Sequence, residues 1–187
     1  MIRAVYDACI LYSALLRDIL LCLAEAKLVF PLWSEEIHDE WIRNLLQNRP
    51  DLQREKLLRT CREMDFHFPG SLQRGYESII PTLTLPDPQD RHVLAVAIHA
   101  EANYIITNNL DDFPNDILRI DGIEALSPDK FVLRLIQQAS APVLEVVKNH
   151  RSSLVRPPKT VDEYLATLEK QGLSDTVAFL RKHKDVI

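Results

Sequence analysis

The sequence predicts an α/β fold, in which a parallel sheet of four to five strands is flanked by helices and followed by a small all-α C-terminal appendage. Short β-prone runs alternate with helical segments over residues 1–135, and this alternation is typical of a parallel sheet that is covered on both faces. After residue 135 only helical segments follow. At 187 residues the chain is long enough for one well-filled core and a small appendage.

The first elements form two strand–helix units. Residues 2–6 are a β-prone run that stops at Asp7, and the apolar stretch 10–23 is long enough for a helix. Residues 27–32 predict the second strand. Ser34 then has the character of an N-cap, with acids in the first turn of a helix that runs to about Gln47.

The middle of the chain is less regular. Residues 52–64 predict a helix that is broken at Pro69-Gly70-Ser71. Residues 78–85 could hold a short strand, but Pro81 would make it an irregular one.

Two further strand–helix steps complete the α/β part. Asp87 is expected to cap a helix that continues to about Ala102, with Pro88 in its first turn. Strands are predicted at residues 104–107 and 123–126. Ser127 then caps another helix, and Pro128 occupies the first helical position.

The tail is predicted as a separate helical extension, with one domain at residues 1–135 and the extension at residues 136–187. Arg156-Pro157-Pro158 permits no helix, and Thr160 has capping-box spacing to Glu163 at the start of the next helix, which ends at Gly172. These helices are too short to have much core of their own, so they must pack on the main domain or on a partner.

Composition limits the function classes. The net charge of −5 argues against a protein coated in positive charge for non-specific nucleic-acid binding. Residues 1–141 carry 14 Lys+Arg against 21 Asp+Glu, whereas residues 142–187 carry 8 against 6, so base is concentrated in the tail. No apolar run approaches the length of a membrane span, so we expect no membrane association and a cytoplasmic location. Cys9, Cys22 and Cys61 lack metal-site spacing and are expected to be buried thiols.

Acidic residues follow the predicted strands. Asp7, Asp90 and the pair Asp111-Asp112 lie beyond strand ends or at the start of the next helix, and in a parallel sheet all such ends lie along one edge. Glu36 and Glu40 share one face of the helix after the second strand. Converging carboxylates repel one another unless a divalent cation neutralises them. Ligands that are all oxygen favour Mg²⁺ or Mn²⁺, which can activate water against a phosphodiester.

Each acid taken alone has a structural interpretation as well. Asp90 could accept hydrogen bonds from the free backbone N–H groups at a helix start. Its helical spacing from Leu94 and Ala97, however, directs it toward the buried face of the helix. Asp7 could accept a turn hydrogen bond. Glu36 and Glu40 could form a solvated helix face, and Asp111 and Asp112 could be ordinary loop residues. Their joint placement is what favours a functional site.

The combination of motifs resembles PIN-domain nucleases, and within them the VapC-type ribonuclease toxins of bacterial toxin–antitoxin pairs. The resemblance covers residues 1–135 in order, and the helical tail resembles an extension carried by a subset of these toxins. The motifs are Val5-Tyr6-Asp7-Ala8, Glu40 within residues 34–41, residues 87–95 around Asp90, and residues 105–114 around Thr107.

The resemblance implies a site and a cofactor. Asp7, Glu40 and Asp90 match the metal-binding acids of the family, which would hold Mg²⁺ or Mn²⁺, and Thr107 matches its small hydroxyl residue. The family commonly has Asp two residues after this Thr, whereas here Asn109 contributes an oxygen but no charge. Asp112 is expected to substitute for it as a catalytic residue. With three acids rather than four, a second metal should be held less well.

The resemblance also implies partners. An RNA substrate, a small antitoxin lying in an apolar groove with a basic side chain at the acidic site, and a homodimer are expected. The candidate RNA contacts are Arg91 and His92 beside Asp90, Arg59 and Arg62 on the helix at residues 52–64, and Arg151 and Arg156 in the tail, with a solvated surface as the alternative for each.

Two rival functions remain. One is a PIN-like RNA- or partner-binding protein that is catalytically weakened through Asn109. The other is a phospho-receiver domain, which would need an acid pair after the first strand and a Lys ending a late strand. This chain has a lone Asp7 there and no such Lys.

Overall fold

The structure is a computed structural model that describes all 187 residues. Its centre is a five-stranded, all-parallel sheet in the order β3-β2-β1-β4-β5. The predicted α/β class with a helical appendage is therefore confirmed. The strands are β1 (Arg3–Tyr6), β2 (Phe30–Ser34), β3 (Leu72–Gln73), β4 (Tyr104–Ile106) and β5 (Glu124–Leu126).

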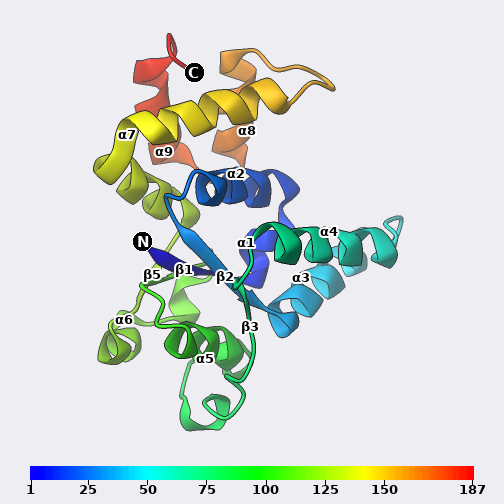
Figure 1. Cartoon of the computed structure of the whole chain (residues 1–187), viewed down its shortest axis with the longest axis vertical. Coiled ribbons are helices and arrows are strands. Elements are labelled where there is room, and N and C mark those ends of the chain that lie inside the picture. The colour runs from blue at the N-terminus through cyan, green and yellow to red at the C-terminus, as the bar shows by residue number, and fades with distance from the viewer.

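Helices cover the sheet on both faces, as a parallel sheet requires (Figure 1). The central strand β1 is buried from Ala4 to Tyr6, and Trp33 and Trp41 have no exposed surface, so both belong to the core. The helices of this part are α1 (Ala8–Tyr12), α2 (Ala14–Glu25), α3 (Glu35–Asn48), α4 (Arg54–His67), α5 (Arg91–His99) and α6 (Asn115–Leu118), with short 3-10 turns at Ile80–Thr82, Pro88–Asp90, Leu110–Asp112 and Arg119–Asp121.

The single helix predicted over residues 10–23 is wrong, because two helices occupy this segment. Ser13 has an extended backbone, with φ −80° and ψ 116°, and its hydroxyl accepts a hydrogen bond from the Leu16 N–H as the N-cap of α2. Ser13 therefore ends α1 and begins α2 within a largely apolar segment, because its hydroxyl can cap a helix.

The region between α4 and α5 also differs from the prediction. The strand considered at residues 78–85 is absent, and Pro81 lies in a 3-10 turn. The edge strand is instead β3, directly after the predicted break at residues 69–71. Asp87 caps as predicted, accepting from the Gln89 N–H at 2.8 Å, but a 3-10 turn precedes α5, which ends at His99 rather than at Ala102.

The appendage shares one hydrophobic core with the sheet domain. Its helices are α7 (Pro128–Ser153), α8 (Val161–Lys170) and α9 (Ser174–Leu180), followed by a 3-10 turn at Arg181–His183. Helices α8 and α9 contribute fully buried Tyr164 and Val177 to the common core cluster. The expectation that the tail packs on the main domain is confirmed. No helix has the length and apolar character needed to span a membrane.

Helix α7 connects the two parts of the chain. Ser127 caps it and Pro128 is its first residue, as predicted. The helix is interrupted at Ala139, which has non-helical angles of φ −153° and ψ 67°. The domain boundary predicted between residues 135 and 136 falls within α7, and it stays a prediction.

The buried His150 ties α7 to the rest of the molecule. Its Nδ1 lies 2.7 Å from the Tyr164 hydroxyl and its Nε2 lies 3.2 Å from Oδ2 of Asp18 on α2. The appendage is thereby joined to the α/β part by a polar contact as well as by the core.

Candidate active site

The site is organised by the pairing of the first and fourth strands. Because β1 and β4 are parallel neighbours, Asp7 and Thr107 leave their strands at the same edge of the sheet. The Thr107 hydroxyl donates to Oδ2 of Asp7 at 2.7 Å. The other oxygen of Asp7 accepts the Ala8 N–H at 2.6 Å as the N-cap of α1. Residues that are 100 positions apart thus hold one carboxylate in a fixed orientation.

Cys9 is a third partner of Asp7 that sequence reasoning missed. Its thiol donates to Oδ2 of Asp7 at 3.1 Å and lies 3.5 Å from the Thr107 hydroxyl, while the Asn108 N–H donates to the sulfur at 3.3 Å. Burial and the charge of Asp7 raise the pKa of this thiol to about 12, so it remains a donor at neutral pH. Its position two residues after Asp7, in the first turn of α1, was the available signal.

Asp90 is a carboxylate that lacks protein partners. Its Oδ2 is buried without any hydrogen bond, and it makes no side-chain cap for α5. The helix-cap interpretation of Asp90 is therefore wrong: Asp90 stands at the N-cap position of α5 but its side chain accepts no backbone N–H, whereas Asp87 caps the 3-10 turn before it. Burial, followed by the charges of Asp7, Asp87, Asp112 and Glu40, raises the pKa of Asp90 from its usual 3.8 to about 7.

The charges acting on Asp90 identify which predicted acids the fold brings together. Asp7, Glu40 and Asp112 all act on it, so the acid that follows β1, an acid of α3 and one of the turn after β4 lie near enough to Asp90 to affect its pKa. Asp7 has 5% of its surface exposed. Burial raises its pKa as well, and the charge of Glu40 adds to this, while hydrogen bonds from Thr107, Cys9 and Ala8 oppose it.

Glu40 faces a buried histidine. His92, predicted as a phosphate contact, is only 5% exposed, and its Nε2 lies 3.3 Å from Oε2 of Glu40. Its Nδ1 lies 3.9 Å from Oε2 of Glu36, which is 54% exposed. His92 is therefore directed toward carboxylates of α3 rather than toward solvent, because it lies in the buried first turn of α5.

The loop after β4 forms a closed pattern of hydrogen bonds. The Asn109 N–H donates to the Thr107 hydroxyl at 2.9 Å, and the Asn109 side-chain amide donates to Oδ2 of Asp112. Thus Asn109 does not replace an acid directly but holds Asp112, whose charge acts on Asp90.

The donor set fits a hard divalent cation, although no three carboxylate, imidazole or thiol groups lie close enough together to form a complete metal-binding cluster. The unpartnered buried oxygen of Asp90 and its raised pKa are the features that a cation would relieve. Asp7 and Glu40 carry further carboxylate oxygens on neighbouring elements, and oxygen ligands suit Mg²⁺ or Mn²⁺.

The basic residues proposed for RNA lie in different settings. Arg91 is half-buried beside Asp90, and its Nε has no hydrogen-bond partner. Arg59 pairs with Glu63 at 2.8 Å on the exposed face of α4. In the tail, Arg151 donates to the Lys159 carbonyl at 3.0 Å. Arg62 and Arg156 are exposed.

The tail residues are remote from the acids. In Figure 1 the second half of α7 and the loop after it lie at one end of the molecule, and α5 lies at the opposite end. Arg91 is thus the only one of these arginines in the same turn as a site carboxylate.

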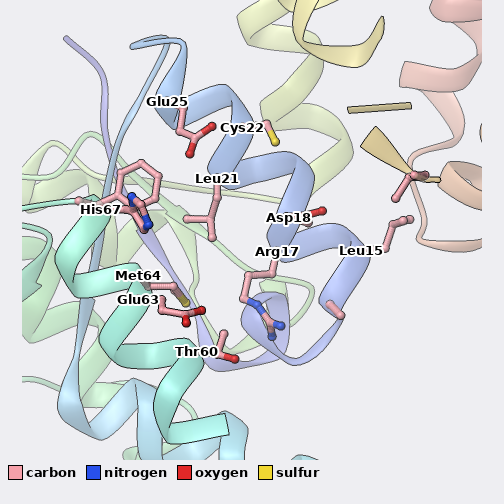
Figure 2. Close-up of a pocket in the computed structure, with 13 residues that line it drawn as sticks. Leu15, Arg17, Asp18, Leu21, Cys22, Glu25, Thr60, Glu63, Met64 and His67 are labelled. Atoms are coloured by element: carbon pink, nitrogen blue, oxygen red, sulfur yellow. The ribbon is translucent and has the colours of Figure 1, made fainter. Parts of the chain in front are cut away.

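A groove of about 650 Å³ lies between α2 and α4. Figure 2 shows side chains of the two helices facing each other across it, with Leu21 and Met64 among the apolar ones and Asp18, Glu25 and Glu63 among the acids. Leu154, at the end of α7, also lines the groove. None of the predicted site residues lines it.

Comparisons with known proteins add independent findings. A family model described as "PIN domain" matches residues 3–111, and one described as "VapC50 C-terminal domain" matches residues 128–182. The chain is 34% identical over 97 residues to "Putative ribonuclease VapC50" of Mycobacterium tuberculosis (strain ATCC 25618 / H37Rv). That match covers 52% of this chain and 57% of the relative, so it spans little more than half of either protein. No solved structure gives a significant match.

Proposed function

The chain belongs to the PIN-domain family, and from that premise we propose that it is a divalent-metal-dependent endoribonuclease, the toxin of a toxin–antitoxin pair. The observation that carries the proposal is the buried, unpartnered Oδ2 of Asp90 among the charges of Asp7 and Glu40. A carboxylate in this state is costly to maintain. Strongly perturbed carboxylates of this kind are typical of functional sites, and a bound divalent cation would neutralise the charges around Asp90.

In the proposed site Asp7, Glu40 and Asp90 hold Mg²⁺ or Mn²⁺. The bound ion would lower the pKa of a water and stabilise the charge of the phosphodiester under attack. Thr107 and Cys9 fix the orientation of Asp7 through their hydrogen bonds.

Residues around the ligands have supporting roles. Asp112, held by Asn109, adds negative charge beside Asp90 and would orient water. Arg91 is half-buried in the turn that follows Asp90, and its guanidinium would contact an RNA phosphate near the metal, although its Nε is buried. Arg62 and Arg156 are proposed only as outlying contacts to the RNA backbone.

The proposal is tested by RNA cleavage with Mn²⁺, Mg²⁺ or EDTA, using Asp7→Asn and Asp90→Asn. Both variants should lose metal-dependent cleavage while their circular dichroism spectra stay unchanged. Asp111→Asn is a matched control, because Asp111 is exposed in the same acidic region and is not among the main charges that raise the pKa of Asp90. Retained cleavage in either test variant would contradict the assignment.

The same proteins distinguish the nuclease from the alternative function, which is an RNA- or partner-binding protein that does not cleave RNA. The alternative predicts Mn²⁺ or RNA binding by calorimetry with no cleavage in the wild type. The close pairing of Asn109 with Asp112 favours an intact acidic site over a weakened one, because it keeps a carboxylate beside Asp90.

We also propose that a small antitoxin occupies the groove between α2 and α4. The apolar side chains of the groove suit the apolar face of an amphipathic segment. Because the groove is lined by Asp18, Glu25 and Glu63 but by only one arginine, Arg17, the segment should carry basic side chains. We further propose that the toxin is a homodimer that acts in the cytoplasm. Leu21→Lys, at a partly exposed position of the groove, should weaken antitoxin capture without changing RNA cleavage by the free toxin. Sedimentation of the free chain tests dimerisation.

A further inference from the structure

His92 is a buried polar side chain that the proposed mechanism leaves without a role. It lies two residues after Asp90, at the start of α5, and its ring meets α3. On the basis of the proposed metal site, we infer that His92 is a positioning residue, which holds the Glu40 carboxylate in the orientation needed to bind the ion.

The contacts of the ring support this inference. Nε2 lies 3.3 Å from Oε2 of Glu40, whereas the buried Nδ1 has no hydrogen-bond partner and is 3.9 Å from Glu36. A buried imidazole that served the fold alone would normally have both nitrogens satisfied. Here the one close polar contact of the ring is to a proposed metal ligand.

Glu40 needs such a partner. Its side chain has several rotatable bonds and is 24% exposed, so without a fixed neighbour it would lose considerable rotamer freedom on binding a cation. No other side chain forms an ion pair or hydrogen bond with Glu40 in the structure. A histidine that fixes a ligating carboxylate before binding removes part of this cost.

The position of His92 also couples two ligands. Asp90 and His92 are two residues apart in one turn, so the backbone that positions the Asp90 carboxylate also positions the ring that contacts Glu40. Because α5 and α3 are joined at this contact, the separation of the two carboxylates depends on it.

The inference is tested by Mn²⁺ titration calorimetry of the full chain, with thermal unfolding measured in parallel. His92→Leu should weaken Mn²⁺ binding about 10- to 100-fold, the range seen when such supporting partners of metal ligands are removed. His92→Gln, which retains an N–H donor, should recover most of the affinity. Glu36→Gln is the matched control and should stay within about twofold, since Glu36 lies farther from the ring and is mostly exposed.

A double-mutant cycle with Glu40→Gln separates positioning from a general effect on the fold. If His92 acts through Glu40, the double variant should bind Mn²⁺ no more weakly than Glu40→Gln alone. Equal Mn²⁺ affinity of His92→Leu and the wild type, or additive losses in the cycle, would overturn the inference while leaving the metal site intact. Failure of the wild type to bind Mn²⁺ would instead overturn the proposed function, and this inference with it.

Discussion

Replacing Asp90 with Asn should stabilise the metal-free protein at alkaline pH. Folding buries this carboxyl beside other acids and raises its pKa from 3.8 to about 7. A group whose pKa is raised on folding contributes stability that is complete below the unfolded pKa and lost as pH rises through the folded pKa. The loss therefore extends from about pH 4 to about pH 7, and Asn, which does not ionise, avoids it.

The expected change in the free energy of unfolding follows from the pKa values of Asp90 in the unfolded and folded states. At 1.36 kcal/mol per pKa unit, a change from 3.8 to about 7 corresponds to about 4 kcal/mol. Partial exposure of Asp90 screens the interaction, so about 2 kcal/mol is the working expectation. For a chain of this size that is about 4–8 °C in Tm.

The assay is thermal or urea unfolding in EDTA at pH 5 and pH 8. Asp90→Asn should exceed the wild type by a margin that is larger at pH 8 than at pH 5, and Asp111→Asn should show no such pH dependence. Excess Mn²⁺ should reverse the order, because the ion stabilises only the chain that binds it. An equal margin at both pH values would refute the argument that repulsion and burial at Asp90 destabilise the metal-free fold.

Three further predictions concern other parts of the chain. Asn109→Asp should tighten Mn²⁺ binding in calorimetry by adding a charge to the site; unchanged affinity would show that Asn109 lies outside the metal's reach. Cys9→Ser should keep most of the cleavage rate and Cys9→Ala should lower it severalfold, since only Ser retains a donor to Asp7; equal rates would make the thiol a packing residue. Asp129→Ala should lower the unfolding free energy by about 2–4 kcal/mol in urea titration, because the carboxylate accepts the N–H groups of Asp175 and Thr176 at 2.9 and 2.8 Å; a loss below about 1 kcal/mol would mean that water replaces it.

The order and type of most elements could be predicted because strands and helices were separated by strong local signals. Ser34, Ser127 and Thr160 each cap the predicted helix. Ser13 was missed because it lies within a largely apolar stretch, where a capping serine and a serine inside a helix have the same local pattern. The two-residue strand β3 was missed because its pairing with β2 is a tertiary interaction without its own periodicity.

The carboxylates of the candidate site could be predicted from the sequence, but the side chains that contact them could not. Residues that follow neighbouring parallel strands share an edge, so the grouping of Asp7 with the loop after residues 104–107 followed from topology. Asp90 was grouped with them by its position at the start of a helix and by the family resemblance, because no strand directly precedes it. The contacts of Cys9 with Asp7 and of His92 with Glu40 depend on side-chain directions that spacing does not determine. His92 was therefore expected at the RNA surface, although the structure buries it.

The central position of β1 has a consequence for the synthesis of the chain. Asp7 is made first, but the Thr107 hydroxyl that holds it comes 100 residues later. At roughly 5–20 residues per second, about 5–20 s pass before the ribosome has made both residues. Long-range pairing of this kind makes folding wait for the later partner. The nascent chain thus has no assembled carboxylate cluster, and none of the proposed nuclease activity, until nearly all of the α/β domain has been translated.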